Sequence, residues 1–331
     1  LPMNAMKETK LSKYSTKYPI LGPVLGLVLV VLLFSKTRGF LTPNNITIIL
    51  TQTVIVTIAA LGMTKIIVSG GIDLSVGAVV AFTSVLGAHA VSAGLPMVLV
   101  IIVALIGGGL FGLINGTIIA GFKMNPFIVT LGMMGVARGA SKWLGKNQTV
   151  NYDPESSINF LMNNPSQIGG NEIPLWLPPI GVVVALLMAV VISTVMNKTV
   201  FGRHIYAIGS NEATARLCGI RTELNKLKVY LFAGLLYGLA GVMQLSRLQQ
   251  GDPTVAIGLE LDVIAAVVIG GASLSGGTGS IFGAVIGALI MATLRNGSDQ
   301  VGWPNYAQEI IIGLVIVLAV GLDRLRQRQI N

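Results

Sequence analysis

Residues 197–228 read NKTVFGRHIYAIGSNEATARLCGIRTELNKLK and form the one long polar, basic stretch of an otherwise apolar chain. Within this stretch, Ser210 is placed to cap a short helix of about one to three turns, and Gly219 is placed to end it. A short amphipathic helix between two apolar segments is expected to protrude into water. It is therefore either the contact point of a soluble partner or a solvated connector with no partner.

The composition of the whole chain predicts a membrane protein. Apolar residues make up 53% of it and charged residues 11%, with a mean hydropathy of +0.79, whereas soluble domains average about 25% charged residues. So few charges cannot cover the surface of a soluble globule, and the length fits one compact membrane domain. The formal charge of +9 comes from basic residues at the ends of apolar segments, which argues for membrane topology and against nucleic-acid binding.

The single Cys218 excludes an internal disulfide and a thiolate metal cluster.

Ten apolar segments are candidate spans, because crossing a bilayer takes about 20 apolar residues. They are residues 18–34, 45–63, 66–91, 95–121, 126–145, 174–196, 228–246, 261–275, 279–296 and 305–323. The expected fold is an all-α integral membrane protein of about ten transmembrane helices. Its parts are an N-terminal segment 1–17, a transmembrane domain 18–323 that contains the 197–228 loop, and a C-terminal tail 324–331.

The basic residues set the expected orientation. Lysines precede the first apolar run, and no small-residue cleavage site follows it, so we expect an uncleaved first span with segment 1–17 in the cytoplasm. Ten spans then place the 197–228 loop and the tail 324–331 in the cytoplasm as well. With this topology 15 of the 22 lysines and arginines lie inside, as the positive-inside rule requires.

Asp73 lies about ten positions into a hydrophobic segment, where an ionisable residue is costly and usually has a functional or backbone-capping role. Glycines 70–71 are expected to break the helix, and Asp73 with Ser75 to cap the half that restarts. A broken helix points its positive end at a cavity. Asp73 is thus either a structural cap or a solute contact, and Glu260 and Asp262 at the head of a later span have the same two interpretations.

Glycines at spacings of three and four recur in the spans 95–121, 228–246 and 279–296. Such spacing puts small residues on one helix face and lets helix backbones pack closely in lipid. Phe111-Gly112 is echoed by Phe282-Gly283, which suggests an inverted repeat.

Motifs for nucleotide binding and catalysis are missing. In the glycine-rich GASLSGGT at 271–278, Gly277 takes the place of the phosphate-binding lysine. GASKWLGKN at 139–147 has one residue too many and ends on Asn147 in place of Ser or Thr. His89 and His204 form neither a metal pair nor a triad. We therefore expect no catalytic site, no metal site and no cofactor bound by this chain.

Four stretches together resemble the inner-membrane permeases of bacterial ABC importers for monosaccharides, of the ribose type. They are AIGSNEATARLCGI at 207–220, SGGIDLSVGA at 69–78, NPFIVTLGMM at 125–134 and LELDVIAAVVIGGASLSGGTGSIFGAVIGALI at 259–290. They follow the order of that family, and the resemblance extends from about Gly39 to Asp323.

This resemblance implies a permease subunit that receives a monosaccharide from a periplasmic binding protein and works with a second permease copy. ATP and Mg would be used by a separate cytoplasmic ATPase subunit. The residues expected to couple the chain to that subunit are Gly209, Asn211, Glu212, Ala213, Ala215, Arg216, Gly219 and Ile220. The residues expected along the translocation pathway are Asp73, Ser75, Asn125, Phe127, Glu260 and Asp262.

Two loops are expected on the outer side of the membrane, and one residue, Lys65, departs from the pattern of the family. The acidic, Asn-rich loop 146–173 and the loop 247–260 are expected to face the periplasm, either as docking surface for the binding protein or as plain connections. Lys65 departs from the ribose-type pattern, which has an apolar residue there, and we expect its side chain to snorkel to the cytoplasmic face.

Two other functions remain open. An ion-gradient-driven secondary transporter would need Asp73 and Asp262 as titrating or ion-binding carboxylates, but has no use for an ATPase-docking loop. An ABC permease for a nucleoside or a branched-chain amino acid would share the general design. A membrane-embedded lipid enzyme is disfavoured, because the sequence has no cluster of acids or histidines near a basic headgroup site.

Overall fold

The computed structural model describes residues 20–163 and 178–328. The predicted N-terminal segment 1–17, residues 164–173 of the predicted outer loop and residues 329–331 of the predicted tail lie outside these ranges.

Each of the ten predicted spans falls mainly on one helix of its own. These helices are α2 (Leu21–Phe34), α3 (Pro43–Val68), α4 (Val76–Ser92), α5 (Met97–Gly121), α6 (Pro126–Leu144), α7 (Ile180–Lys198), α10 (Thr222–Leu248), α11 (Leu259–Ile269), α12 (Ile281–Val301) and α13 (Asn305–Arg328). The 197–228 stretch contains α8 (Val200–Ser210) and α9 (Glu212–Leu217). A short 3-10 helix, η1 (Ser157–Leu161), follows strand β1 (Val150–Asn151), which pairs antiparallel with β2 (Gln250–Gly251) so that Val150 lies opposite Gly251.

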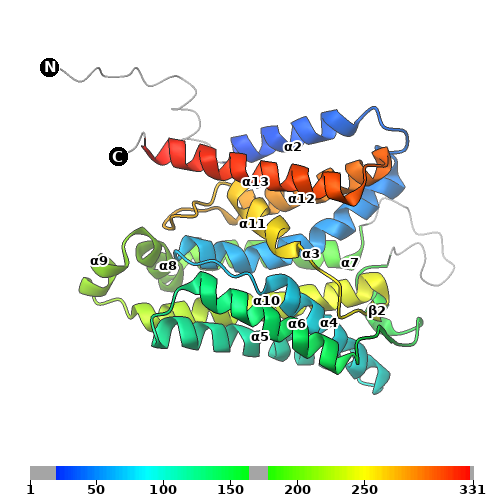
Figure 1. The fold of residues 1–331 in the computed structure, drawn as a ribbon, viewed down its shortest axis with the longest axis horizontal. Helices are drawn as coiled ribbons and strands as arrows, with labels where there is room; N and C mark the ends of the chain where they lie inside the picture. Colours follow the sequence, from blue (N-terminus) through cyan, green and yellow to red (C-terminus); the bar gives the residue numbers. More distant parts are fainter. Residues whose placement is uncertain (1–19, 164–177, 329–331) are drawn as a thin grey trace.

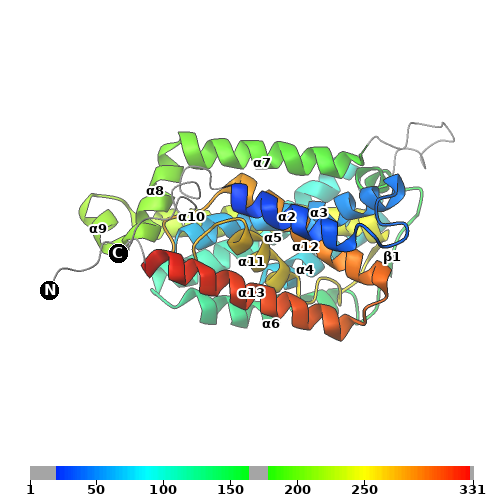
Figure 2. The ribbon, with the colours of Figure 1, turned by 90° about the horizontal axis from the view of Figure 1, so that it is seen from above.

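The long helices lie side by side along the long axis of the molecule (Figure 1). At the centre, α3 packs against α10, α11 and α12, and α10 also packs against α4 and α5. Seen from above, α7 covers one side of this group, whereas α6 and α13 cover the other (Figure 2). The end of α13 and the α8–α9 segment lie at one end and the β1–β2 pair lies at the other, whereas α2 starts near the middle and runs toward the β1–β2 end (Figures 1 and 2).

Five of the described helices are long and apolar enough to cross a membrane by themselves: α3, α5, α7, α10 and α12. Three shorter apolar stretches accompany them, namely α2, α4 and residues 305–318 of α13. The all-α class is confirmed, whereas the count of ten transmembrane spans stays a prediction.

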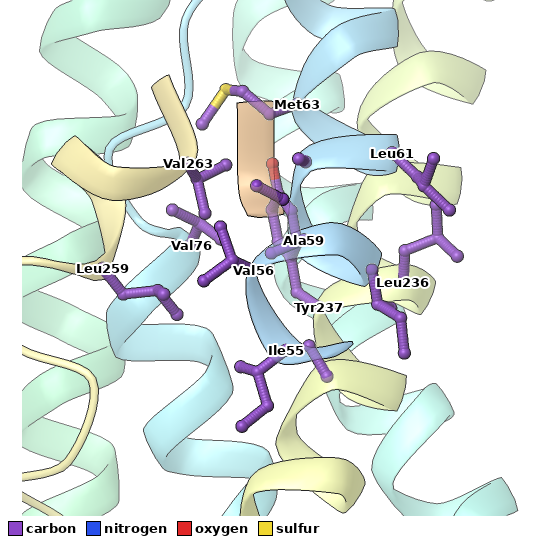
Figure 3. Close-up of a cluster of buried hydrophobic side chains, with 14 of the residues drawn as sticks. Ile55, Val56, Ala59, Leu61, Met63, Val76, Leu236, Tyr237, Leu259 and Val263 are labelled. Carbon is purple, nitrogen blue, oxygen red and sulfur yellow. The ribbon is translucent and has the colours of Figure 1, made fainter. Parts of the chain in front are cut away.

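The core is built around α3, in which every residue from Thr53 to Val68 is buried. A helix that is apolar on all sides needs neighbours on all sides, and Figure 3 shows α3 side chains such as Val56 and Met63 among those of α4, α10 and α11. The predicted close packing of glycines is found between α5 and α10. A Cβ at Gly108 would overlap the carbonyl oxygen of Gly234, and one at Gly112 would overlap that of Tyr230.

The helix break around Asp73 differs in position from the prediction. Residues 66–68 were assigned to the third span, but they form the end of α3. The break at 69–75 therefore separates two helices, and Gly70 at φ +85° makes the left-handed turn that ends α3.

A second break, at residues 270–280, follows α11, and α11 ends with the same hydrogen-bond pattern as α3. Gly70 N–H donates to the Ile67 carbonyl and Gly71 N–H to that of Ile66. In the same register, Gly271 N–H donates to the Val268 carbonyl and Ala272 N–H to that of Val267. The ends of α3 and α11 therefore share one hydrogen-bond pattern, and the inverted repeat suggested by the Phe-Gly echo stays a prediction.

The prediction that Lys65 snorkels to water is wrong. Its side chain is only 2% exposed, and its Nζ lies 5.6 Å from the centroid of the Phe232 ring. The reason is that α7, α8 and α10 all pack around α3. The Lys65 side chain is therefore enclosed by neighbouring helices.

Candidate functional site

The predicted amphipathic helix is present as α9, but its cap is not the predicted one. Ser210 is the last residue of α8, and Asn211 is the N-cap of α9, since its Oδ1 accepts a hydrogen bond from the Thr214 N–H at 2.9 Å. Gly219, at φ +83°, ends α9 as predicted. Ile220 N–H then donates back to the Ala215 carbonyl at 3.1 Å, which folds the chain tightly into the start of α10.

Four charged side chains fix α9 to the first turns of α10. Lys226 Nζ lies 2.6 Å from Glu212 Oε2. Arg216 lies between two carboxylates, 2.7 Å from Glu223 Oε1 and 3.6 Å from Glu212 Oε1. These pairs are partly exposed, so each contributes modestly. Together they make α9 and the start of α10 one unit.

One face of α9 packs against the molecule, and the residues at its end are exposed. Ala215 is 4% exposed and packs inward, whereas the side chain of Leu217 is 89% exposed and Cys218 is an exposed free thiol. Since α9 lies at one end of the molecule (Figure 1), an apolar side chain as exposed as that of Leu217 is suited to contact with another surface.

The end of α8 fits tightly between two other segments. A Cβ at Gly209 would overlap the carbonyl oxygen of Val68, the last residue of α3, and would lie 2.6 Å from the backbone nitrogen of Gly277 in the 270–280 loop. The Gly277 N–H donates to the same Val68 carbonyl at 2.9 Å. The ends of α3 and α8 and the 270–280 loop therefore meet backbone to backbone.

Tyr206, one turn earlier in α8, adds a second link. Its hydroxyl donates to the Gly279 carbonyl at 3.0 Å. Burial raises the pKa of the Tyr206 hydroxyl, so it remains a neutral donor. Gly279 directly precedes Ser280, the N-cap of α12, whose Oγ accepts from the Gly283 N–H. Movement of α8 would thus reach the start of α12 as well as the end of α3.

Asp73 and Ser75 are brought together in the break between α3 and α4. Asp73 Oδ1 accepts from the Ser75 N–H at 2.8 Å and from its hydroxyl at 2.6 Å. Asn115 of α5 donates to the Ser75 hydroxyl at 3.2 Å, and the Leu74 N–H donates to Thr130 of α6 at 3.1 Å. Asp73 is 1% exposed and Ser75 fully buried. Ser75 directly precedes α4, but its side chain makes no capping hydrogen bond to that helix. Asp73 therefore holds the break itself in shape through Ser75, and the predicted side-chain cap of α4 is not formed.

Among the described residues, the remaining pathway candidates make no hydrogen bond or ion pair with Asp73. Asn125 is the N-cap of α6, since its Oδ1 accepts from the Phe127 N–H at 3.0 Å, and the Phe127 ring is 49% exposed. Asp262, in the first turn of α11, accepts both hydrogen bonds of an Arg295 fork, at 2.7 and 2.9 Å. Glu260 lies against α4, where its Oε2 is 2.7 Å from the place of a Cβ on Gly77.

Several residues of these contacts were missed from sequence. Val68, Tyr206 and Gly277 carry no local signal, because their importance comes from helices distant in sequence. Arg295 did carry a local signal in the sequence, since an arginine inside an otherwise apolar span is expected to have a specific partner.

The chain matches the family model described as branched-chain amino acid transport system / permease component over residues 45–320. That range includes α9, both helix breaks and all the predicted site residues.

Curated relatives match over nearly their full lengths. The ribose import permease protein RbsC of Bacillus subtilis is 43% identical over 92% of this chain and 92% of its own. RbsC of Escherichia coli K12 is 39% identical, with 91% and 92% covered. The L-arabinose ABC transporter permease protein AraH of Azospirillum brasilense is 35% identical, with 92% and 88% covered. No solved structure matches the chain.

Proposed function

The chain belongs to the family described as branched-chain amino acid transport system / permease component, and on that premise we propose how it works as the permease subunit of a monosaccharide ABC importer. The observation that carries the assignment is 35–43% identity to ribose and arabinose permeases over 91–92% of the chain. Since these relatives are transport permeases, the chain is a multi-pass membrane transport protein and not an enzyme.

The energy for import is proposed to come from a separate ATPase subunit, which would bind ATP and Mg and contact α9. Two observations support this. The glycine-rich stretches of the chain lack the lysine spacing of a phosphate loop. In addition, α9 projects from one end of the molecule with Leu217 exposed, beside an apolar and charged groove of about 640 Å³ between α9 and the α5–α6 connection.

The proposed transmission runs through α8. A displacement of α9 would move the start of α10 through the pair of Lys226 with Glu212. It would move α8 as well, and Gly209 of α8 touches both the end of α3 and the loop at Gly277. Closely packed backbone deforms little, so such contacts pass displacement on rather than absorb it.

In the proposed orientation α9 and both termini face the cytoplasm of a bacterium, the ten helices cross its inner membrane, and a second permease copy completes the pore. The end of α13 lies at the same end as α9, and α2 runs away from that end (Figures 1 and 2), which supports an even number of spans. The β1–β2 pair and the loops beside it lie opposite, and there we place the docking surface of a periplasmic binding protein.

The proposed roles of the pathway residues differ among themselves. Asp73 and Ser75 would hold the break before α4 in shape, and Asn125 would cap α6. Phe127, exposed on α6, and the acidic pair Glu260 and Asp262 at the head of α11 remain the proposed pathway contacts.

The experiment that tests this function is reconstitution of the chain in lipid vesicles with the ATPase and binding protein encoded beside it. Uptake of radiolabelled ribose that needs ATP and the binding protein, and that survives a protonophore, is the expected result. Uptake that needs no ATP and stops when the proton gradient is collapsed would establish an ion-gradient carrier instead.

A further inference from the structure

A polar cavity of about 480 Å³ lies at the end of the molecule opposite α9. Residues from α3, α10, α11, α12 and α13 line it, together with the loop before α11. Its polar side chains include Gln52, Gln244, Arg247, Asp262, Arg295 and Glu309. Most membrane-spanning surfaces avoid such groups, so a cluster of them around one cavity calls for a function.

Part of the cavity wall is fixed by its own hydrogen bonds. The bidentate pair of Arg295 with Asp262 joins α12 to α11, and Asp262 is only 4% exposed. On the neighbouring wall, Gln308 of α13 donates to Asp299 Oδ1 at 2.7 Å. The cavity therefore has a rigid polar rim before any solute enters.

Other polar groups of the wall have no protein partner. Gln244 is 5% exposed, and within the described part of the chain neither it nor Arg247 makes a hydrogen bond or ion pair. Gln52 Oε1 is buried and likewise has no hydrogen-bond partner among the described residues. Of these three side chains, only Gln52 has a polar atom that is buried without a partner, which is costly; Gln244 and Arg247 line the cavity with donor and acceptor capacity unused. Their partner is therefore expected to be something that enters the cavity.

The chemistry of the wall selects a class of solute. Amide side chains both donate and accept hydrogen bonds, and the charged groups are of both signs, so no single charge is favoured. Apolar side chains such as Ile55, Val56 and Met291 supply the rest of the surface. The volume lies in the range of about 300–1,000 Å³ that is usual for small-molecule sites.

Resting on the proposed function, we propose that this cavity is a transit site for a neutral polyhydroxylated solute, a monosaccharide released from the binding protein. Gln52 and Gln244 hold hydroxyl groups of the solute, and Arg247 a further one. No aromatic ring is among the described residues that line the cavity. The stacking that strengthens the binding of many ring-shaped ligands is missing there, so the site is weak, as release into a pathway requires.

The same helix connects this site to the other end of the molecule. Gln52 lies in α3, and the last residue of α3 is Val68, whose carbonyl contacts Gly209 and Gly277. The stretch from Thr53 to Val68, buried throughout, therefore connects the cavity wall to the contact with α8. Movement of α8 would change the shape of the cavity wall.

The first test is saturation-transfer NMR of D-ribose on the full chain in lipid nanodiscs, with Gln244→Met and Gln52→Met as variants. Methionine keeps the length of glutamine and removes its hydrogen bonds. The matched control is Gln249→Met, at the same end of α10, where the Gln249 amide donates to Asn163 outside the cavity. We expect ribose signal from the unmodified chain and the control, and at least a roughly threefold weaker signal from each cavity variant. Equal signals from all four proteins would overturn the transit site.

The second test separates this inference from the function itself. In the reconstituted importer, the cavity variants are expected to keep ATP hydrolysis stimulated by the loaded binding protein, while ribose transported per ATP falls severalfold. Unchanged transport by both variants refutes the cavity inference alone. Failure of the unmodified chain to import any sugar refutes the proposed function as well.

Discussion

The backbone of Gly209, near the end of α8, lies against the carbonyl oxygen of Val68, the last residue of α3, so closely that a Cβ on Gly209 would overlap that oxygen. The Val68 carbonyl also accepts a hydrogen bond from Gly277. One buried helix end is thus in direct contact with the segment that leads into α9. This contact is the structural basis for proposing that α9 transmits movement to the membrane helices.

Replacing Gly209 with alanine should disrupt this contact. The overlap cannot be relieved by a side-chain rotation, because the opposing atoms are backbone, so α8 must shift away from α3. We expect the variant to insert in the membrane normally and to lose at least about 1 kcal/mol of stability, as overpacking does. Sugar-stimulated ATP hydrolysis in the reconstituted importer is expected to fall severalfold.

The matched control is Gly22→Ala in α2, where an added Cβ meets nothing within 4 Å. It should leave both the melting temperature and the stimulated ATPase rate unchanged. If Gly209→Ala behaved like Gly22→Ala, the contact between α8 and α3 would have no part in coupling.

Reversing the charge of Glu212 should separate ATP hydrolysis from transport. Glu212→Lys removes the 2.6 Å pair with Lys226 and places a second positive charge beside Arg216. Because exposed pairs contribute about 0.2–1 kcal/mol each, the melting temperature should move by a few degrees at most. We expect membrane insertion to be retained, and ribose uptake by vesicles to be lost together with ATPase stimulation. Transport at the normal rate would remove Glu212 from the coupling contact.

The pair of Asp262 with Arg295 should matter for stability more than the exposed pairs of α9. Arg295→Met leaves the carboxylate of Asp262, 4% exposed, without its partner. Breaking a buried pair costs about 3–5 kcal/mol, and the partial exposure of Arg295 places this case at the lower end. A lowered melting temperature of the purified chain is expected. The double variant Asp262→Asn with Arg295→Met should recover part of the loss, and a double variant less stable than either single one would contradict this account.

The sequence predicted the fold wherever the signal was local. Apolar length located ten helices, glycine spacing predicted the close packing of α5 on α10, and Gly219 marked the end of α9. Helix ends were less accurate, because residues 66–68 are as apolar as the span that follows. The cap of α9 was also misplaced by one residue, since Ser210 and Asn211 are both good N-cap residues.

The sequence could not predict contacts that depend on three segments meeting. Gly209, Val68 and Gly277 lie in separate parts of the chain, and only the fold brings their backbones together. Lys65 illustrates the same limit. Near the end of an apolar run a lysine normally reaches water, but the packing of α7, α8 and α10 around α3 encloses its side chain.

The central claim is that α9 faces the cytoplasm, where an ATPase subunit can hold it. Cys218, directly after α9, is the single cysteine of the chain and is exposed, so one labelling measurement tests the claim. A membrane-impermeant maleimide should leave Cys218 unlabelled in intact cells with a permeabilised outer membrane, and should label it in inside-out vesicles of the inner membrane. Labelling in the intact cells and none in the inverted vesicles would place α9 on the outer face and contradict the account.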